Sequence, residues 1–125
     1  VVDTAKSPFV HLRPVPLGAV TISDPFWAPR RYTNASATLP SQFRHLEETD
    51  RLNNFRRAAG KLDAPFVGLY FNDSDVYKWL EAAAWTLAEG PNPELEGMSD
   101  TAIAEVADAQ RPDGYLNTYF ALDKA

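Results

Sequence analysis

The stretch FNDSDVYKWLEAAAW, Phe71–Trp85, decides how this chain folds, because a polar cluster runs directly into a segment with helical spacing. Apolar residues recur there at every third or fourth position, which places them on one face of a helix. This stripe consists of Val76, Leu80, Ala83, Ala84 and Leu87. Gly90 and Pro91 then stop the helix. The stretch therefore predicts an amphipathic helix from about Asp75 to Glu89.

The polar residues that precede this helix are of the types that cap helix N-termini. Either Asp73 or Ser74 is expected to be the N-cap, and Asp75 is expected in the first turn, where the helix dipole favours an acid. The same residues also have the DxD form of some metal-dependent glycosyltransferases, but no nucleotide-binding strand–helix–strand pattern accompanies them. On these grounds alone, capping is the preferred interpretation of the cluster.

Further helical faces flank this segment on both sides. Two shorter apolar stripes lie upstream, and they consist of Leu39, Phe43 and Leu46 and of Leu52, Phe55 and Ala59. Pro40 falls inside the first stripe, so either a helix begins there with proline in its first turn or an earlier helix is kinked. Downstream, a helix that begins near Pro93 carries the stripe Leu95, Met98, Ala102, Val106 and Ala109. Short turns join these helices, so the sequence predicts a mainly α chain of antiparallel helical hairpins.

The N-terminal part of the chain has a different character. Five of the ten prolines lie in residues 1–29, and Pro14 and Pro16 prevent a helix around them. The segment AVTI, Ala19–Ile22, contains β-branched residues and indicates a short strand. We therefore divide the chain into an extended arm with a short strand, residues 1–28, and a helical portion, residues 29–125.

The composition is that of a soluble globular protein, since 45% of the 125 residues are hydrophobic and 23% are charged. No apolar run is long enough for a membrane span, so no membrane partner is predicted. The net charge is −5, and basic residues form only the pairs Arg30-Arg31 and Arg56-Arg57, so no nucleic-acid partner is predicted. The sequence indicates neither a compartment nor an oligomeric state.

The chain contains no cysteine. Within these residues this excludes a disulfide framework, a thiolate nucleophile and a Cys-ligated zinc site. The two histidines, His11 and His45, are far apart in the sequence and do not indicate a metal site. We therefore predict no catalytic residue, no metal ligand and no cofactor within this chain.

Hairpin geometry gives the polar cluster a second interpretation. The helix from Asp75 to Glu89 is about 22 Å long, and the next helix runs back over a similar distance. The start of the first helix and the turn after the second should therefore lie at the same end of the hairpin. That end would carry Asn72, Asp73, Asp75, Gln110, Asp113 and Tyr115, together with Asn117. Amides, carboxylates and an aromatic ring are groups that bind sugars, so we predict that these residues contact a carbohydrate. The alternative is that the two caps only satisfy each other.

Longer motifs of the chain resemble one known family. VTISDPFWAPRR, NFRRAAG, FNDSDVYKWLEAAAW, PNPELE and AQRPDGYLNTYF occur in the order and at the spacing found in the N-terminal part of glycoside hydrolase family 127, the β-L-arabinofuranosidases. The resemblance covers nearly the whole chain from about Val20. It implies that the helices are the first hairpins of an (α/α)6 barrel, that the arm packs against a β-sandwich domain, and that the ligand is a glycan containing L-arabinofuranose.

The resemblance also implies a catalytic apparatus that this sequence does not match. In the family a cysteine nucleophile is held in a zinc site with further cysteines and a glutamate, and a second glutamate is the acid/base. We therefore expect these residues to be a fragment of a longer glycosidase, with zinc in the full-length protein and no activity in the fragment alone. Such a fragment would expose faces that its missing helices should cover, which predicts aggregation.

Two other hypotheses remain open. The chain could be a non-catalytic helical module that binds a glycan or a partner helix on the same scaffold. It could also belong to a different hydrolase or lyase on the same barrel, in which Asp73, Asp75 and Asp113 carry the acid/base chemistry.

Overall fold

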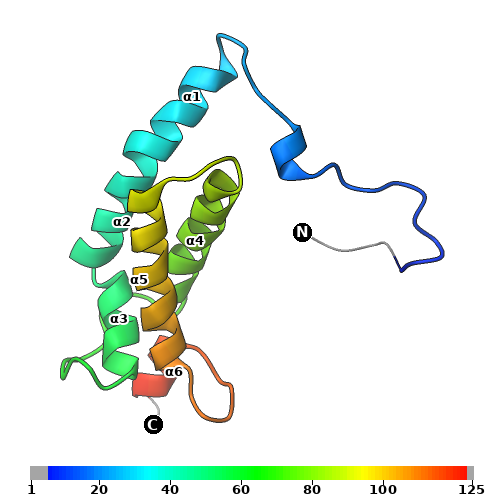
Figure 1. Ribbon diagram of the computed structural model, residues 1–125. Coiled ribbons are helices and arrows are strands. Elements are labelled where there is room, and N and C mark those ends of the chain that lie inside the picture. Colours follow the sequence, from blue (N-terminus) through cyan, green and yellow to red (C-terminus); the bar gives the residue numbers. More distant parts are fainter. Residues whose placement is uncertain (1–5, 124–125) are drawn as a thin grey trace.

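The computed structural model describes residues 6–123, and within this range the chain is built of helices (Figure 1). The α-helices are α1 (Trp27–Thr33), α2 (Leu39–Glu48), α3 (Arg51–Ala58), α4 (Asp73–Leu87), α5 (Pro93–Ala109) and α6 (Thr118–Asp123). A 3-10 turn, η1 (Leu17–Ala19), and a π-helical turn, η2 (Asn34–Thr38), complete the helical elements. The predicted mainly α class is confirmed. None of the helices in residues 6–123 is long and apolar enough to cross a membrane.

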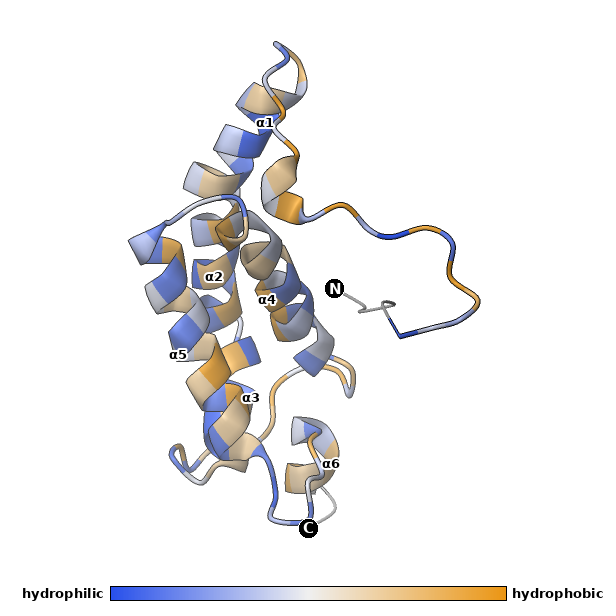
Figure 2. Ribbon diagram, turned by 45° about the vertical axis from the view of Figure 1, so that its right-hand side comes forward, coloured by the Kyte–Doolittle hydropathy of each residue, from blue (hydrophilic) through white to orange (hydrophobic). Residues whose placement is uncertain are grey.

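The core lies between α2, α4 and α5, and α3 and α6 close one end of it (Figure 1). These helices carry both hydrophilic and hydrophobic residues, as their amphipathic stripes predict (Figure 2). The buried apolar residues are Leu39, Leu46, Leu52, Phe55, Val76, Trp79, Ala83, Leu95, Ala102 and Ala109. Every predicted stripe contributes to this set, whereas Ala84 of the α4 stripe is exposed.

Trp79 fixes how α4 packs on α2. Its indole Nε1 donates a hydrogen bond to the Leu39 carbonyl at 2.9 Å, and its ring centroid lies 4.9 Å from that of Phe43. The side chain is buried, so an unpaired indole N–H would be costly there. This contact therefore sets the height at which α4 lies against α2.

The first helical rod runs without a break from α1 through η2 into α2. The Leu39 N–H donates to the Asn34 carbonyl five residues back, which is the bond of a π-helix. Pro40 follows directly, and in a regular α-helix its ring would clash with the carbonyl four residues before it. The wider π-helical turn relieves this clash. Pro40 therefore lies in the first turn of α2, as the first of the two predicted alternatives has it, but α2 continues the rod instead of starting it.

The arm, residues 6–23, extends away from the bundle (Figure 1). The predicted strand at Ala19–Ile22 is wrong, because Leu17–Ala19 form η1 and residues 6–123 contain no strand. Val20 has extended backbone angles, but a strand needs a neighbour that pairs with its backbone groups, and the described part of the chain offers none. The predicted boundary after residue 28 is not tested by this arrangement and stays a prediction.

Two buried amides, Asn54 and Asn72, hold the loop between α3 and α4. The Asn54 Nδ2 donates to the Val67 carbonyl at 2.9 Å, and the Asn54 Oδ1 accepts from the Val67 N–H at 3.1 Å. The Asn72 amide donates to the same Val67 carbonyl at 3.4 Å. Gly68 lies between these contacts with φ +106°, a conformation that favours glycine. These contacts fix the position of the loop relative to α3 and to the start of α4.

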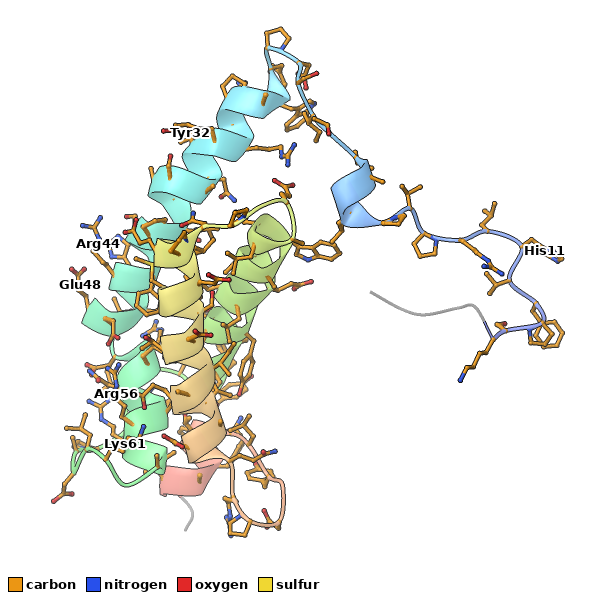
Figure 3. The ribbon with its side chains drawn as sticks, in the orientation of Figure 1. His11, Tyr32, Arg44, Glu48, Arg56 and Lys61 are labelled. Atoms are coloured by element: carbon orange, nitrogen blue, oxygen red, sulfur yellow. The ribbon has the colours of Figure 1, made fainter. Side chains whose placement is uncertain are left out.

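Charged side chains tie α3 to α2 and α5. The Arg56 Nη1 lies 2.6 Å from the Glu47 Oε2, and the Arg56 Nε lies 3.1 Å from the Glu105 Oε1. The Lys61 Nζ contacts Glu105 at 2.8 Å and Asp108 at 2.6 Å. Figure 3 shows Arg56 and Lys61 on this side of the bundle. Because the pairs share Glu105 and Arg56, they form a network that joins three helices rather than isolated surface pairs.

Gly68→Ala should destabilise the protein by about 1–3 kcal/mol, because alanine is strained at a positive φ and its Cβ would overlap the Asn72 amide nitrogen. The matched control is Gly97→Ala inside α5, where a Cβ meets no atom within 4 Å. That change should stabilise the helix by about 0.5–1 kcal/mol. Urea unfolding of the two variants checks both signs, and equal effects would contradict the proposed role of Gly68.

Candidate functional site

The two segments predicted to meet at one end of the hairpin do meet. The Asp73 Oδ2 accepts from the Thr118 N–H at 2.7 Å, and the Asp73 Oδ1 accepts from the Thr118 Oγ1 at 2.5 Å. Both residues are buried. The first turn of α4 is therefore bonded directly to the first turn of α6. We call this part of the molecule the joined end, and it comprises loop 65–72, the start of α4 and residues 110–120.

The predicted cap is wrong in its assignment. Asn72 is the N-cap residue, and its side chain bonds the Val67 carbonyl instead of the helix. The backbone explains why no side-chain cap is needed: the Ser74 and Asp75 N–H groups donate to the Phe71 and Asn72 carbonyls at 3.1 and 3.0 Å. The Asp73 carboxylate is therefore free to bond Thr118. Asp75 does lie in the first turn, as predicted, and Asp73 lies there as well instead of at the N-cap.

Asp75 lies in the same turn of α4 as Asp73, but its side chain is directed away from the other residues of the joined end. Residues two apart on a helix do not share a face, and Asp75 is directed to Arg51, whose Nε lies 3.3 Å from its Oδ2, and to Lys78 at 3.8 Å. It lines an open cavity of about 470 Å³ between α2 and α4. The structure thus separates Asp75 from Asp73, although the sequence groups them.

Gln110 and Asp113 belong to the turn after α5. The Gln110 Nε2 donates to the Gly114 carbonyl at 3.0 Å, and the Asp113 Oδ1 accepts from the Tyr115 N–H at 3.0 Å. Gly114 has φ +86°, which this tight turn requires. These side chains are exposed, as is the Tyr115 ring. The turn therefore presents polar atoms and an aromatic ring to solvent at the joined end.

The structure adds an aromatic group that sequence reasoning missed. Tyr70 and Phe71 lie 5.1 Å apart, and the Tyr119 ring packs 5.3 Å from Phe66 and 6.5 Å from Tyr70. Tyr70 is 59% exposed and Phe71 is 50% exposed. The signal was present in the sequence, because the run LYF directly precedes the polar cluster. Together with Tyr115 these rings give the joined end an apolar surface beside its polar groups.

The Tyr77 phenol of α4 has a raised pKa. Burial, reinforced by the nearby Asp73 carboxylate, raises the pKa of the Tyr77 phenol to about 12. The Tyr77 ring also packs against Phe55 at 5.9 Å. The phenol therefore stays protonated at neutral pH and acts as a neutral packing group.

The residues that the structure describes do not fit a zinc site. Cysteine is absent from the sequence, and residues 6–123 contain no group of three His, Cys, Asp or Glu side chains that could hold a metal ion.

The chain matches the profile of a family described as the β-L-arabinofuranosidase, GH127 catalytic domain, over residues 19–125. It is 37% identical, over 122 aligned residues, to a non-reducing end β-L-arabinofuranosidase of Bifidobacterium longum subsp. longum. That alignment covers 82% of this chain and 18% of the relative.

Two solved structures are similar in both fold and sequence. A crystal structure of a GH127 β-L-arabinofuranosidase from Geobacillus stearothermophilus T6 matches with a TM-score of 0.80 and 39% identity, covering 83% of this chain and 18% of the other. A second structure, of a GH127 β-arabinofuranosidase, matches with a TM-score of 0.79 and 39% identity, covering 87% and 17%. This chain thus spans less than a fifth of the length of these relatives.

Thr118→Val should destabilise the protein by about 1–3 kcal/mol, because it keeps the side-chain shape but leaves a buried oxygen of Asp73 without its donor. Thr118→Ser keeps the hydroxyl and should lose less. Urea unfolding at neutral pH compares the two variants. A serine variant as unstable as the valine variant would show that the methyl group, and not the hydrogen bond, matters.

Stability should fall as the pH rises from about 10 to 12. In the unfolded chain the Tyr77 phenol loses its proton near its ordinary pKa of about 10, whereas the folded state holds the proton up to about 12. The unfolded state is therefore favoured progressively across this window, and the contribution is fully present below it. Urea unfolding at several alkaline pH values should show a smaller loss for Tyr77→Phe. Identical pH dependence in the two proteins would refute this assignment.

Proposed function

Because this chain belongs to glycoside hydrolase family 127, we propose that its helices, the first hairpins of an (α/α)6 barrel, form a carbohydrate-contacting end of a β-L-arabinofuranosidase. The observation that carries the proposal is the match of residues 19–125 to the family's catalytic domain. In this proposal residues 29–125 belong to the barrel, and residues 1–28 lead into it.

The joined end has the chemistry that a sugar requires. Sugar rings stack on aromatic faces through their C–H groups, while their hydroxyls bond amides and carboxylates. Tyr70 and Tyr115 supply exposed rings, and Gln110 and Asp113 supply polar atoms at the surface. Asn72 and Asp73 are buried, so we assign them the role of positioning these groups through Val67 and Thr118.

The bond-breaking chemistry is assigned to residues outside these 125. The sequence has no cysteine to act as a zinc-held nucleophile, and both oxygens of Asp73 already accept hydrogen bonds. Zinc, implied by the family, would then be bound elsewhere in the full-length protein. The chain's own residues position the glycan rather than react with it.

The alternative that the chain offers is a non-catalytic glycan-binding module on the same scaffold. It would use the same exposed rings and polar atoms of the joined end, since binding alone requires no nucleophile. Acid/base chemistry by Asp73, Asp75 and Asp113 is less well supported, because Asp73 is bonded to Thr118 while Asp75 is paired with Arg51 on another face.

The test is release of L-arabinose from a nitrophenyl β-L-arabinofuranoside by the full-length protein that carries this sequence. Tyr70→Ala and Tyr115→Ala should each lower kcat/KM by roughly two- to tenfold, since aromatic stacking contributes about 0.5–1.5 kcal/mol. The matched control is Tyr32→Ala on α1, whose ring is 74% exposed and lies outside the joined end.

Three outcomes decide between the readings. Turnover by the full-length protein, with losses confined to Tyr70 and Tyr115, supports the proposal. Glycan binding without any turnover would replace it by the non-catalytic module. The carboxylate mechanism would be favoured instead if Asp113→Asn abolished turnover while zinc chelation left the turnover of the unmodified protein unchanged.

A further inference from the structure

One buried cation of α3, Arg57, pairs with residues outside the ion-pair network around Arg56. Its side chain is 6% exposed, and its Nη2 donates to the Asp50 Oδ1 at 2.8 Å while its Nη1 donates to the Asn54 Oδ1 at 2.9 Å. Its Nε is buried without a hydrogen-bond partner among residues 6–123. A buried guanidinium with an unpaired N–H is costly, and an apolar side chain of similar size would avoid that cost. Filling space alone therefore does not account for an arginine at this position.

Asp50 anchors the guanidinium at the turn between α2 and α3. It is the N-cap residue of α3 and has φ 63°, a left-handed conformation that aspartate adopts more readily than most residues. Hydrogen bonds from Asn53 and Arg57 hold the pKa of the Asp50 carboxyl below its usual range. The carboxylate is therefore ionised at neutral pH, and its charge-assisted bond fixes one side of the Arg57 guanidinium.

The other side of the guanidinium orients the amide of Asn54. The Asn54 Oδ1 accepts from the Arg57 Nη1 and from the Val67 N–H, while the Asn54 Nδ2 donates to the Val67 carbonyl. A guanidinium only donates, so it requires the oxygen of the amide, and not the nitrogen, on its side. The reverse orientation would direct the amide nitrogen at two donors. Arg57 thus stabilises the one orientation in which Asn54 holds both backbone groups of Val67.

The loop that Asn54 holds carries an exposed aromatic ring. Val67 is bonded to Asn54, and its carbonyl also accepts from the Asn72 side chain. Further along the loop the Asn72 N–H donates to the Leu69 carbonyl at 2.9 Å, which closes a four-residue turn. Tyr70 is a central residue of this turn and is 59% exposed. The position of the Tyr70 ring therefore depends on how firmly Val67 is held.

We propose that Arg57 is a positioning residue for the glycan. It orients Asn54, which fixes Val67, and the turn that follows places the Tyr70 ring against a sugar. This role rests on the proposed function, in which Tyr70 stacks on a sugar ring. Arg57 is buried and does not itself contact the glycan. Its loss should therefore weaken binding only as far as Tyr70 contributes to binding.

The test is a double-mutant cycle in the full-length protein, with turnover of a nitrophenyl β-L-arabinofuranoside as the measurement. Arg57→Met removes the donors but leaves the Asn54 Oδ1 bonded to Val67. KM should rise by roughly two- to fivefold with kcat unchanged, because stacking holds the substrate and the transition state alike. In the Tyr70→Ala background the same change should have no further effect on KM, because the ring that Arg57 positions is gone.

The matched control is Arg56→Met, which removes the neighbouring arginine from its ion pairs with Glu47 and Glu105. It should lower Tm but leave KM unchanged, both alone and in the Tyr70→Ala background. Arg57→Lys retains a cationic donor, so it should recover part of the loss in KM. The lysine variant also carries the cycle if Arg57→Met does not fold.

Hydrogen exchange of the loop measures the positioning independently of turnover. The Val67 N–H is bonded to Asn54 in the unmodified protein. Peptides that cover residues 65–72 should therefore exchange faster in Arg57→Met, by roughly threefold or more. The same peptides should keep the exchange rate of the unmodified protein in Arg56→Met.

A rise in KM that vanishes in the Tyr70→Ala background, together with faster exchange of the loop, would support the role of Arg57. Additive effects of the two substitutions, or an unchanged KM in an active protein, would overturn it. If the unmodified protein releases no L-arabinose, the proposed activity fails, and the same cycle is measured on the Kd for an arabino-oligosaccharide. Unchanged exchange of residues 65–72 in Arg57→Met would overturn the role of Arg57 in either case.

Discussion

The buried amide of Asn54 does the work of a strand partner in a protein region that has no strand. It donates to the Val67 carbonyl and accepts from the Val67 N–H, so a loop without regular structure keeps its backbone groups satisfied. The same carbonyl accepts from Asn72, and the next residue, Asp73, binds Thr118. One line of side-chain-to-backbone bonds therefore runs from α3 through the loop to α6. The positions of Tyr70 and Tyr115 depend on it.

Helix faces could be predicted from the sequence because they depend on local spacing. The stripes around Leu39, Val76 and Leu95 are buried as expected, and the hairpin brought Asp73 to Thr118. The predictions that failed concern residues whose partners are distant in the chain. Asp73 is of a residue type that caps helices, but its carboxylate oxygens instead accept hydrogen bonds from Thr118, which lies 45 residues away. Ala19–Ile22 has strand propensity, but no strand lies beside it in the described chain. Asp75 was grouped with Asp73 although residues two apart on a helix do not share a face, and its pairing with Arg51 shows where its side chain is directed.

The ends and the sides of these helices carry different information. At the joined end, turns expose aromatic rings and polar atoms that no regular element needs. Along α4, Trp85 and Lys78 are spaced as helix–helix contacts are, with Ala82 small enough to let a backbone approach. This division follows from geometry: helix sides satisfy their own backbone and offer only side chains, whereas helix ends and turns offer both. An end that exposes polar atoms and aromatic rings and a side with the spacing of helix contacts therefore coexist on a short chain without sharing residues.

The π-helical turn η2 determines how α1 is rotated about the axis of the first rod relative to α2. Each hydrogen bond of a π-helix spans five residues, whereas each bond of an α-helix spans four. Asn34–Thr38 therefore correspond to an α-helical turn with one residue inserted. Removing one of these residues would restore regular α-helix and rotate everything before it by roughly 100° about the rod axis. Trp27 would then move away from the cavity that it lines with Trp85. The position of α2 and its hydrogen bond with Trp79 would not change. The turn next to Pro40 thus sets the rotation of α1, and of the N-terminal arm before it, relative to the rest of the bundle.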